Sequence, residues 1–564
     1  MSPLAATARR QARRRAVRRL GAPLAVLVLA LARAPLGAQM PLTHTDDAAP
    51  VASGALRLTV TNGWKRYDQR FGNGMMTDLG ADLAADSLGP AQMPRLAPIQ
   101  TSLRTLSGSP TTRLSLGQLG VKSDARVVTT AFALEYGVTR RLSVGVLVPF
   151  LQTRRTIQLH VSGDTSHANV GYVPIGTRST AAATNAAAVA AYAAAAASLQ
   201  ARITSCQQNP NGSGCAAVTA DPTGAAAAVA QAQSFAGAVS ALGTTAATAI
   251  VAPRDNSRLA TAIEAQRAAL NQQLQQYLGA GAGVSTSVFY ATNDFSYLDL
   301  NGRDGVPGLL QSSLGGGLDS LHTTERMYIG DVAVGAQYLL LDHFAHDSVA
   351  IPRVQMRVVV GGLVRFATSL PDSGRNLADI PTGEGAGAEV RSALDVVSGR
   401  FGATVAGRYT RSFSRTVEAS LVGDPDAPWP YPVFGPRQRR AGDVIGLDVT
   451  PRYFVSGWLS LNAHYGLEHI GATTWSATDV QDSCADCLAY ASPLPGPTET
   501  ARTAQRLGLG ARMSSVDSYA RGQAAFPIEV SITHLETVTG GLALPKDTRD
   551  QIQVRIFYQL RRAR

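Results

Sequence analysis

The sequence predicts an all-β transmembrane barrel of about twelve antiparallel strands, with an Ala-rich α-helical insertion in one long loop. Three observations predict it. Segments of about ten residues alternate between apolar and polar side chains, short and long connections alternate along the chain, and the chain begins like an exported protein. About ten residues is the length that a tilted membrane strand needs.

The first segment is typical of a secretory signal peptide. The basic stretch "ARRQARRRAVRRLG" precedes the apolar run "APLAVLVLALA" and the small residues of "RAPLGAQM". We expect residues 1–38 to be removed, with cleavage near Ala38 or, alternatively, at Ala32, because the apolar run is too short to span a membrane. Eight arginines leave with this segment, so the net charge of +11 falls to about +3, and nucleic acid is not an expected partner.

The segment "LSVGVLVPFL" (Leu142–Leu151) illustrates the strand pattern. Its Leu, Val and Phe side chains occupy alternate positions, and successive side chains of a strand point to opposite faces. The other segments of this kind are "ALRLTVTNGW", "RVVTTAFALEYG", "GDVAVGAQYLLL", "VQMRVVVGGLVRF", "AEVRSALDVV", "FGATVAGRYT", "VIGLDVTPRYFV", "LSLNAHYGLE", "QRLGLGARMS", "AFPIEVSIT" and "QIQVRIFYQL".

The connections favour a membrane barrel over a soluble β-sandwich with one wet face. The short links "VTRR", "VSGR" and "VSGW" alternate with the long links 67–125, 155–325, 367–387, 411–443 and 469–503. In outer-membrane barrels, short turns face the periplasm and long loops face the exterior. We therefore expect residues 39–564 to form a barrel in the outer membrane of a Gram-negative-type bacterium, with both termini in the periplasm.

The two strand faces differ in the way that such a barrel requires. One face is apolar, with tyrosines near the ends of strands, as in an aromatic girdle: Tyr136, Tyr338, Tyr409, Tyr453, Tyr465 and Tyr558. The other face supplies the candidate lumen-lining residues, which are Arg357, Glu389, Arg391, Arg408, Asp448, Arg452, Glu529 and Arg555. Four of these arginines, on successive strands, are expected at one height. They either sort solutes or neutralise acidic neighbours in a salt-bridge ladder.

Residues 178–283 interrupt the strands and form the predicted helical insertion of the second extracellular loop. Alanine and straight-chain residues favour helix, and an apolar stripe runs from Leu259 to Tyr277 with Ser257 as its N-cap. The insertion stands above the barrel mouth or folds back as a plug. The four cysteines form two close pairs, and in an exported protein we expect disulfides Cys206–Cys215 and Cys484–Cys487 rather than a zinc site.

Two motifs are weak evidence for chemistry. Ser460, Asn462, His464 and Glu468 share one face of one strand, but residues two apart are not arranged as a catalytic triad. The stretch "DLNGRDG" (299–305) is similar to a calcium loop, although Arg303 occupies a ligand position, so a polar turn is the better interpretation. No enzyme activity, cofactor or metal is expected.

The segments "ALEYGVTRRLSVGVLVPFLQTR", "IGDVAVGAQYLLL" and "SLPDSGRNLADIPTGEGAGAEVRSALDV" resemble the outer-membrane transporter family associated with the meta-pathway of phenol degradation. The resemblance covers the strands but not the insertion, and it implies passage of small, rather hydrophobic compounds. Residues 39–53 are too short for the N-terminal hatch of the related fatty-acid transporters, which argues against a gated channel of that kind.

The expected function is therefore an outer-membrane channel or transporter for small, hydrophobic or aromatic molecules. The alternative is a surface structural or adhesion protein that the barrel anchors. Expected partners are outer-membrane lipid, small-molecule solutes and the barrel assembly machinery. Pro149 cannot donate a ladder hydrogen bond, so it marks either a harmless bulge or, as the resemblance to fatty-acid-type barrels implies, a lateral gate.

Overall fold

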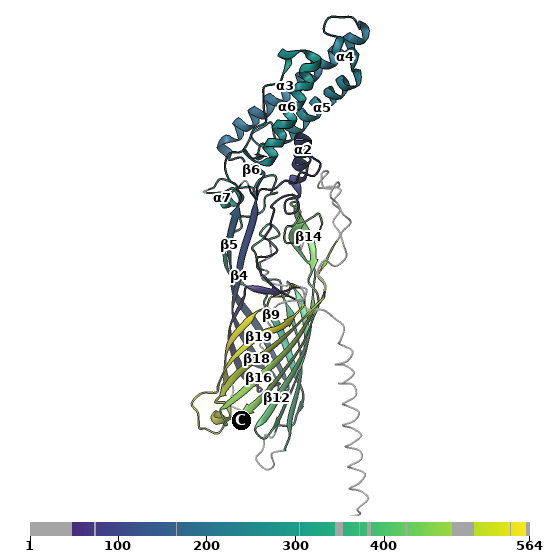
Figure 1. The fold of residues 1–564 in the computed structure, drawn as a ribbon. Coiled ribbons are helices and arrows are strands. Elements are labelled where there is room, and N and C mark those ends of the chain that lie inside the picture. The colour runs from purple at the N-terminus through teal and green to yellow at the C-terminus, as the bar shows by residue number, and fades with distance from the viewer. Residues whose placement is uncertain are drawn as a thin grey trace, which may run out of the picture.

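The computed structural model describes residues 48–559 except 73–74, 165, 304, 345–352, 371–372, 381–384, 424–426, 477–500 and 542. In this part of the chain, twelve antiparallel strands form a closed ring (Figure 1). They are β1 (Ala55–Tyr67), β4 (Gln118–Gly137), β5 (Leu142–Ser162), β9 (Ala333–Asp342), β10 (Gln355–Arg365), β11 (Gly387–Ser398), β12 (Phe401–Ser412), β15 (Val444–Phe454), β16 (Leu459–Ile470), β18 (Arg502–Ser514), β19 (Ile528–Gly540) and β20 (Thr548–Gln559). Each segment named from the sequence overlaps one of them, so the predicted fold is confirmed.

The strands present an apolar outer face and a polar inner face. Leu58, Leu134 and Val146 are 39%, 45% and 36% exposed, whereas Arg57 and Ser143, at alternating positions, are 6% and 1% exposed. A large apolar surface that surrounds a closed barrel is unfavourable in water. It is favourable in contact with the hydrocarbon of a membrane. Tyr136 lies near the end of β4, as the expected tyrosine girdle requires. Tyr465 does not fit the girdle, because it lies in the middle of β16.

Both termini of the described chain lie at one end of the barrel, which we call the proximal end; Ala55 pairs with Gln559 there. The turns at 138–141, 399–400 and 455–458 are short and proximal, as expected. The last connections differ from the prediction. The proximal link 515–527 is long and contains α8 (Val516–Ala520), whereas the distal link 541–547 is short. Long and short connections therefore occur at both ends of the barrel. Closure of the barrel fixes the direction of each strand but not the length of the connection between two strands.

The β4–β5 hairpin rises beyond the barrel wall at the distal end. Its pairing continues to Gln118–Ser162, whereas β4 pairs with β1 only as far as Ala125. The short strand β8 (Thr324–Ile329) pairs with β5 above β9. Beyond the hairpin stands a helical head of α2 (Ala97–Ser107), α3 (Arg178–Gln208), α4 (Ala216–Ala220), α5 (Pro222–Ala241) and α6 (Arg258–Leu278) (Figure 1). The insertion thus stands above the barrel mouth and does not plug it.

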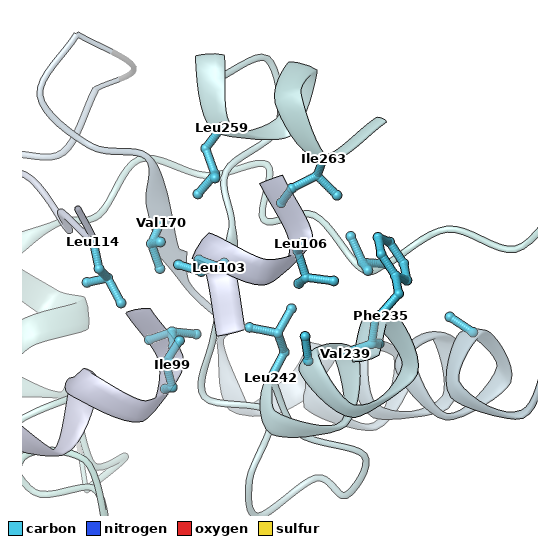
Figure 2. Packing of buried hydrophobic residues seen from close by; sticks show 14 of the residues in the cluster. Ile99, Leu103, Leu106, Leu114, Val170, Phe235, Val239, Leu242, Leu259 and Ile263 are labelled. Carbon is cyan, nitrogen blue, oxygen red and sulfur yellow. The ribbon is translucent and has the colours of Figure 1, made fainter. Parts of the chain in front are cut away.

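The head has its own hydrophobic core, to which a helix outside the insertion contributes. Leu103 and Leu106 of α2 are buried and pack in one cluster with Val239 of α5 and Ile263 of α6 (Figure 2). The sequence analysis did not identify α2, whose residues lie in the first long connection. As predicted, Ser257 caps α6 by accepting a hydrogen bond from the Ala260 N–H.

The Cys206–Cys215 disulfide is confirmed and joins the end of α3 to the start of α4. Cys484 and Cys487 lie outside the described residues. The segment Ile175–Gln208, which contains α3, is long and apolar enough to cross a membrane by composition alone. In the structure, Tyr192 of α3 is fully buried against Phe235 of α5, with ring centroids 4.7 Å apart, so α3 is a core helix of the head.

Shorter elements complete the distal side of the molecule. They are β2 (Gln69–Phe71), β3 (Met76–Asp78), η1 (Pro94–Leu96), β6 (Val170–Tyr172), η2 (Ile175–Thr177), β7 (Val251–Pro253), η3 (Ala280–Ala282), α7 (Tyr297–Asn301), β13 (Arg415–Ser420), β14 (Phe434–Arg440) and β17 (Thr474–Trp475). Strands β13, β14 and β17 form a small sheet above the barrel rim.

Candidate functional site: the barrel interior

A charge network centred on Glu468 crosses the barrel interior. The Glu468 carboxylate accepts hydrogen bonds from Arg408 at 3.1 Å and from Arg506 at 2.6 Å. Asp448 lies 3.9 Å from Arg408 and 3.3 Å from the His464 ring. The Glu468 side chain is only 4% exposed, so opposite charges compensate each other within the barrel instead of facing open water.

Two further ion pairs lie nearer the proximal end. Arg357 bonds to Asp342 at 3.2 Å, and Arg452 bonds to Asp395 at 3.1 Å. The strand register corrects the expectation that the four arginines share one height. Arg391 lies opposite Arg408, whereas Arg357 lies opposite Asp395, further down β11. The arginines therefore occupy two levels, because the stagger of neighbouring strands cannot be read from spacing within one strand.

The remaining candidates also lie on the inner face. Glu389 accepts a hydrogen bond from Thr410 at 2.9 Å, and Glu529 accepts one from Arg512 at 2.6 Å, with Arg555 opposite Glu529 in the register.

The sequence analysis missed two inner clusters that involve the first strand. Arg57 bonds to Glu135 of β4, and Lys65 lies 3.4 Å from Asp547, which Arg549 also contacts. Along β1, Arg57 and Lys65 lie on the face that points away from Leu58 and Val60. This alternation in the sequence could have placed both cations on the inner face.

The described N-terminal residues enter the proximal end of the barrel. The Ala48 N–H donates to Asp395 at 2.9 Å, and the Val51 N–H donates to the Ser143 hydroxyl at 3.1 Å. Ala48 is fully buried against inner-face Leu339 and Val359. The described part of this short segment, from residue 48 onward, therefore narrows the proximal end of the interior.

A small open-sided cavity of about 40 Å³ lies beside this segment, within the wall formed by β4, β5 and β9. Small and apolar residues supply much of its lining, among them Ala133, Gly145, Leu147, Ala333, Gly335 and Leu363. Glu135, Gln337 and Arg391 add polar groups. A cavity of this volume has room for only a few water molecules, so a larger guest would have to displace the side chains that line it.

Pro149 lies where β5 changes its partner strand. Leu147 pairs with Ala333 of β9, and Phe150 pairs with Ile329 of β8, so residues 330–332 interrupt the ladder between them. On the other side of β5, pairing with β4 is continuous through Ala131–Pro149. The Pro149 carbonyl accepts from the Gly330 N–H at 2.8 Å. In an antiparallel strand a residue's N–H and C=O face the same neighbour, so the donor that proline lacks is missing on the interrupted side.

The two weak motifs serve structural contacts. The His464 ring bonds to Thr450 at 2.9 Å and approaches Asp448, so both of its nitrogens are occupied. Asp299 accepts a hydrogen bond from the Ser296 N–H, and its own N–H donates to the Ser296 hydroxyl, which forms a capping box at the start of α7. Among the described residues, no group of three or more His, Cys, Asp or Glu side chains could hold a metal ion.

No protein-family model matches the chain, and no curated protein matches it. Among solved structures, the COG4313 outer membrane channel from Pseudomonas putida F1 is similar at 9% identity and TM-score 0.37, covering 92% of this chain and 100% of that one. A FadL homologue of Pseudomonas aeruginosa has 9% identity and TM-score 0.24, covering 90% and 91%. The beta domain of the Bordetella autotransporter Brka has 7% identity and TM-score 0.27, covering 89% and 99%.

These likenesses are too distant to indicate a function. The class of the protein follows from its own geometry, because a closed antiparallel barrel with an apolar exterior and a charged interior is the architecture of outer-membrane proteins. The chain is an outer-membrane β-barrel of a Gram-negative-type cell.

Proposed function

We propose that the protein is a passive outer-membrane channel for small, apolar or aromatic molecules, and that these molecules cross the barrel wall sideways at Pro149. The observation that carries the proposal is the interrupted ladder between β5 and residues 330–332, which adjoins the internal cavity at Leu147 and Ala333. The Gly330 N–H still donates to the Pro149 carbonyl across this interruption, so a solute that passes there would have to break that one contact.

The axial route is less suited to an apolar molecule. It passes the ion pairs around Glu468 and then the N-terminal segment at Ala48. Burying an apolar molecule among paired charges strips water from those charges without replacing it. A lateral route avoids this cost, because the solute passes between largely apolar residues of the wall, such as Leu147 and Ala333, into lipid. The resemblance to the phenol-degradation transporter family supports the same solute class.

The test compares two proline variants in uptake of naphthalene, an apolar aromatic. Pro149→Val restores the missing backbone donor and is expected to close the interruption and slow uptake at least several-fold. Pro451→Val is the matched control, because β15 keeps one register with β16 on either side of Pro451. Normal uptake by Pro149→Val, or equal loss in both variants, would refute the lateral route. Heat-resistant migration on gels checks that each barrel has folded.

The alternative, a surface or adhesion role, is favoured by the separate core and disulfide of the head. Deletion of residues 178–283 distinguishes the two functions. A channel with a lateral opening keeps naphthalene uptake without the head, whereas an anchor for an adhesive head loses its function and conducts nothing in planar bilayers.

A further inference from the structure

Three arginines stand side by side on the outer surface of the barrel wall. Arg66 of β1 lies opposite Arg126 of β4, and Arg126 lies opposite Arg154 of β5. All three are exposed, and each shares the outward face of its strand with exposed apolar residues such as Leu58, on β1. Neighbouring strands are ~4.8 Å apart, so the three Cα atoms span about 10 Å. We call this set the arginine row.

Among the described residues, an ion pair neutralises the arginine row at one end only. Glu325 of β8 lies 3.8 Å from Arg154, and both side chains are at least half exposed. Arg66 and Arg126 form no ion pair with any described residue, although exposed Asp124 lies two residues before Arg126 on β4 and Asp550 of β20, which pairs with His534, lies diagonally beside Arg66. Like charges directly opposite each other on neighbouring strands repel. The guanidinium groups at the centre of the row therefore keep N–H donors that an external anion can accept.

The depth of the arginine row matches the outer boundary of the membrane. Outward residues of β1 run from Leu56 through Leu58, Val60 and Asn62 to Trp64, and Arg66 follows. At ~3.3 Å per residue and a tilt of about 40°, Arg66 lies about 25 Å above Leu56, which equals the usual height of the apolar band. Trp64 lies just below the row, where tryptophans contact the membrane interface.

We propose that the arginine row binds the phosphate groups of an acylated lipid in the outer leaflet. Arginine binds phosphate through two parallel N–H···O bonds, and adjacent guanidinium groups can engage more than one phosphate oxygen. The wall below the row offers a surface for acyl chains, because Phe132 and Phe150 form an edge-to-face pair on it with ring centroids 5.9 Å apart. The charged row and the apolar surface beneath it thus match the two parts of one lipid.

The experiment titrates the purified, delipidated full-length protein in detergent with bis-phosphorylated lipid A and with dephosphorylated lipid A. Binding of the phosphorylated lipid is expected to be at least tenfold tighter. Arg126→Gln should weaken it about tenfold, since a hydrogen bond to a charged group is lost, whereas Arg126→Lys, which keeps the charge but not the two parallel bonds, should weaken it less. Arg411→Gln is the matched control, because Arg411 is exposed near the distal end of β12, away from the row.

Three outcomes would overturn the proposal. Equal binding of the dephosphorylated lipid would show that phosphate is not recognised. An equal loss in Arg126→Gln and Arg411→Gln would show a general charge effect and no site. Displacement of the lipid by inorganic phosphate alone would identify a small-anion site. Heat-resistant gel migration of Arg126→Gln confirms that a loss of binding does not come from misfolding.

Discussion

Glu468→Gln should destabilise the barrel strongly, because Glu468 is the shared acceptor of two buried guanidinium groups. Arg408 and Arg506 contact it at 3.1 and 2.6 Å. The side chain of Arg408 is 11% exposed, that of Arg506 is 9% exposed, and that of Glu468 is 4% exposed. Removing one partner of a buried pair leaves an uncompensated charge and costs about 3–5 kcal/mol. Asp448 at 3.9 Å offsets part of this loss for Arg408, so we expect the lower end of the range, about 3 kcal/mol.

Denaturant unfolding of the protein refolded in phospholipid vesicles measures this free energy. The matched control is Glu418→Gln, because Glu418 also pairs with an arginine, Arg375 at 2.9 Å, but both side chains are more than a third exposed. Such a surface pair contributes less than about 1 kcal/mol. The double variant Glu468→Gln/Arg506→Gln should recover part of the loss by removing the uncompensated cation. Equal stability of the Glu468 and Glu418 variants, or a double variant no better than the single one, would refute the reasoning.

Three further predictions concern the head and the topology. Burial raises the pKa of Glu264, but hydrogen bonds from Ser287, Tyr290 and Arg267 outweigh it and leave that pKa below its ordinary value. The stability that these bonds give is therefore present above about pH 4.3 and is lost as pH falls through the lowered pKa. The protection of α6 amides from hydrogen exchange, relative to their intrinsic rate at each pH, should fall in acid, and this fall should be absent in Glu264→Gln. Replacing Cys206 and Cys215 by serine should destabilise the head by about 3 kcal/mol, from the entropy of the short loop, and admit protease at 207–214 while the barrel stays intact; unchanged proteolysis would contradict this. Protease added to intact cells should cut within 178–283 and 471–500 but not at the turn 138–141, and cleavage at that turn would reverse the topology.

The barrel could be predicted from the sequence because its physical cause is local. Side chains alternate along every strand, so the apolar positions around Val144 and Val146 identify the lipid face without any knowledge of neighbours. The same alternation assigned Arg408, Asp448 and Glu529 to the inner face. The helix cap at Ser257 and the Cys206–Cys215 bond also depend on residues close in sequence.

The contacts within the site depended on relations between distant segments. Residues 48 and 395 meet although five barrel strands separate them along the chain, because closure of the barrel brings the residues before β1 inside it against β11, and no local pattern encodes that contact. Strand stagger decided that Arg391 faces Arg408 and that Arg66, Arg126 and Arg154 form one row. It likewise decided which neighbour loses a hydrogen bond at Pro149. The sequence by itself determined which face of each strand meets lipid, since that is set by periodicity along one strand. Only the tertiary structure decided which charges become neighbours, since register between strands follows from closure of the whole barrel.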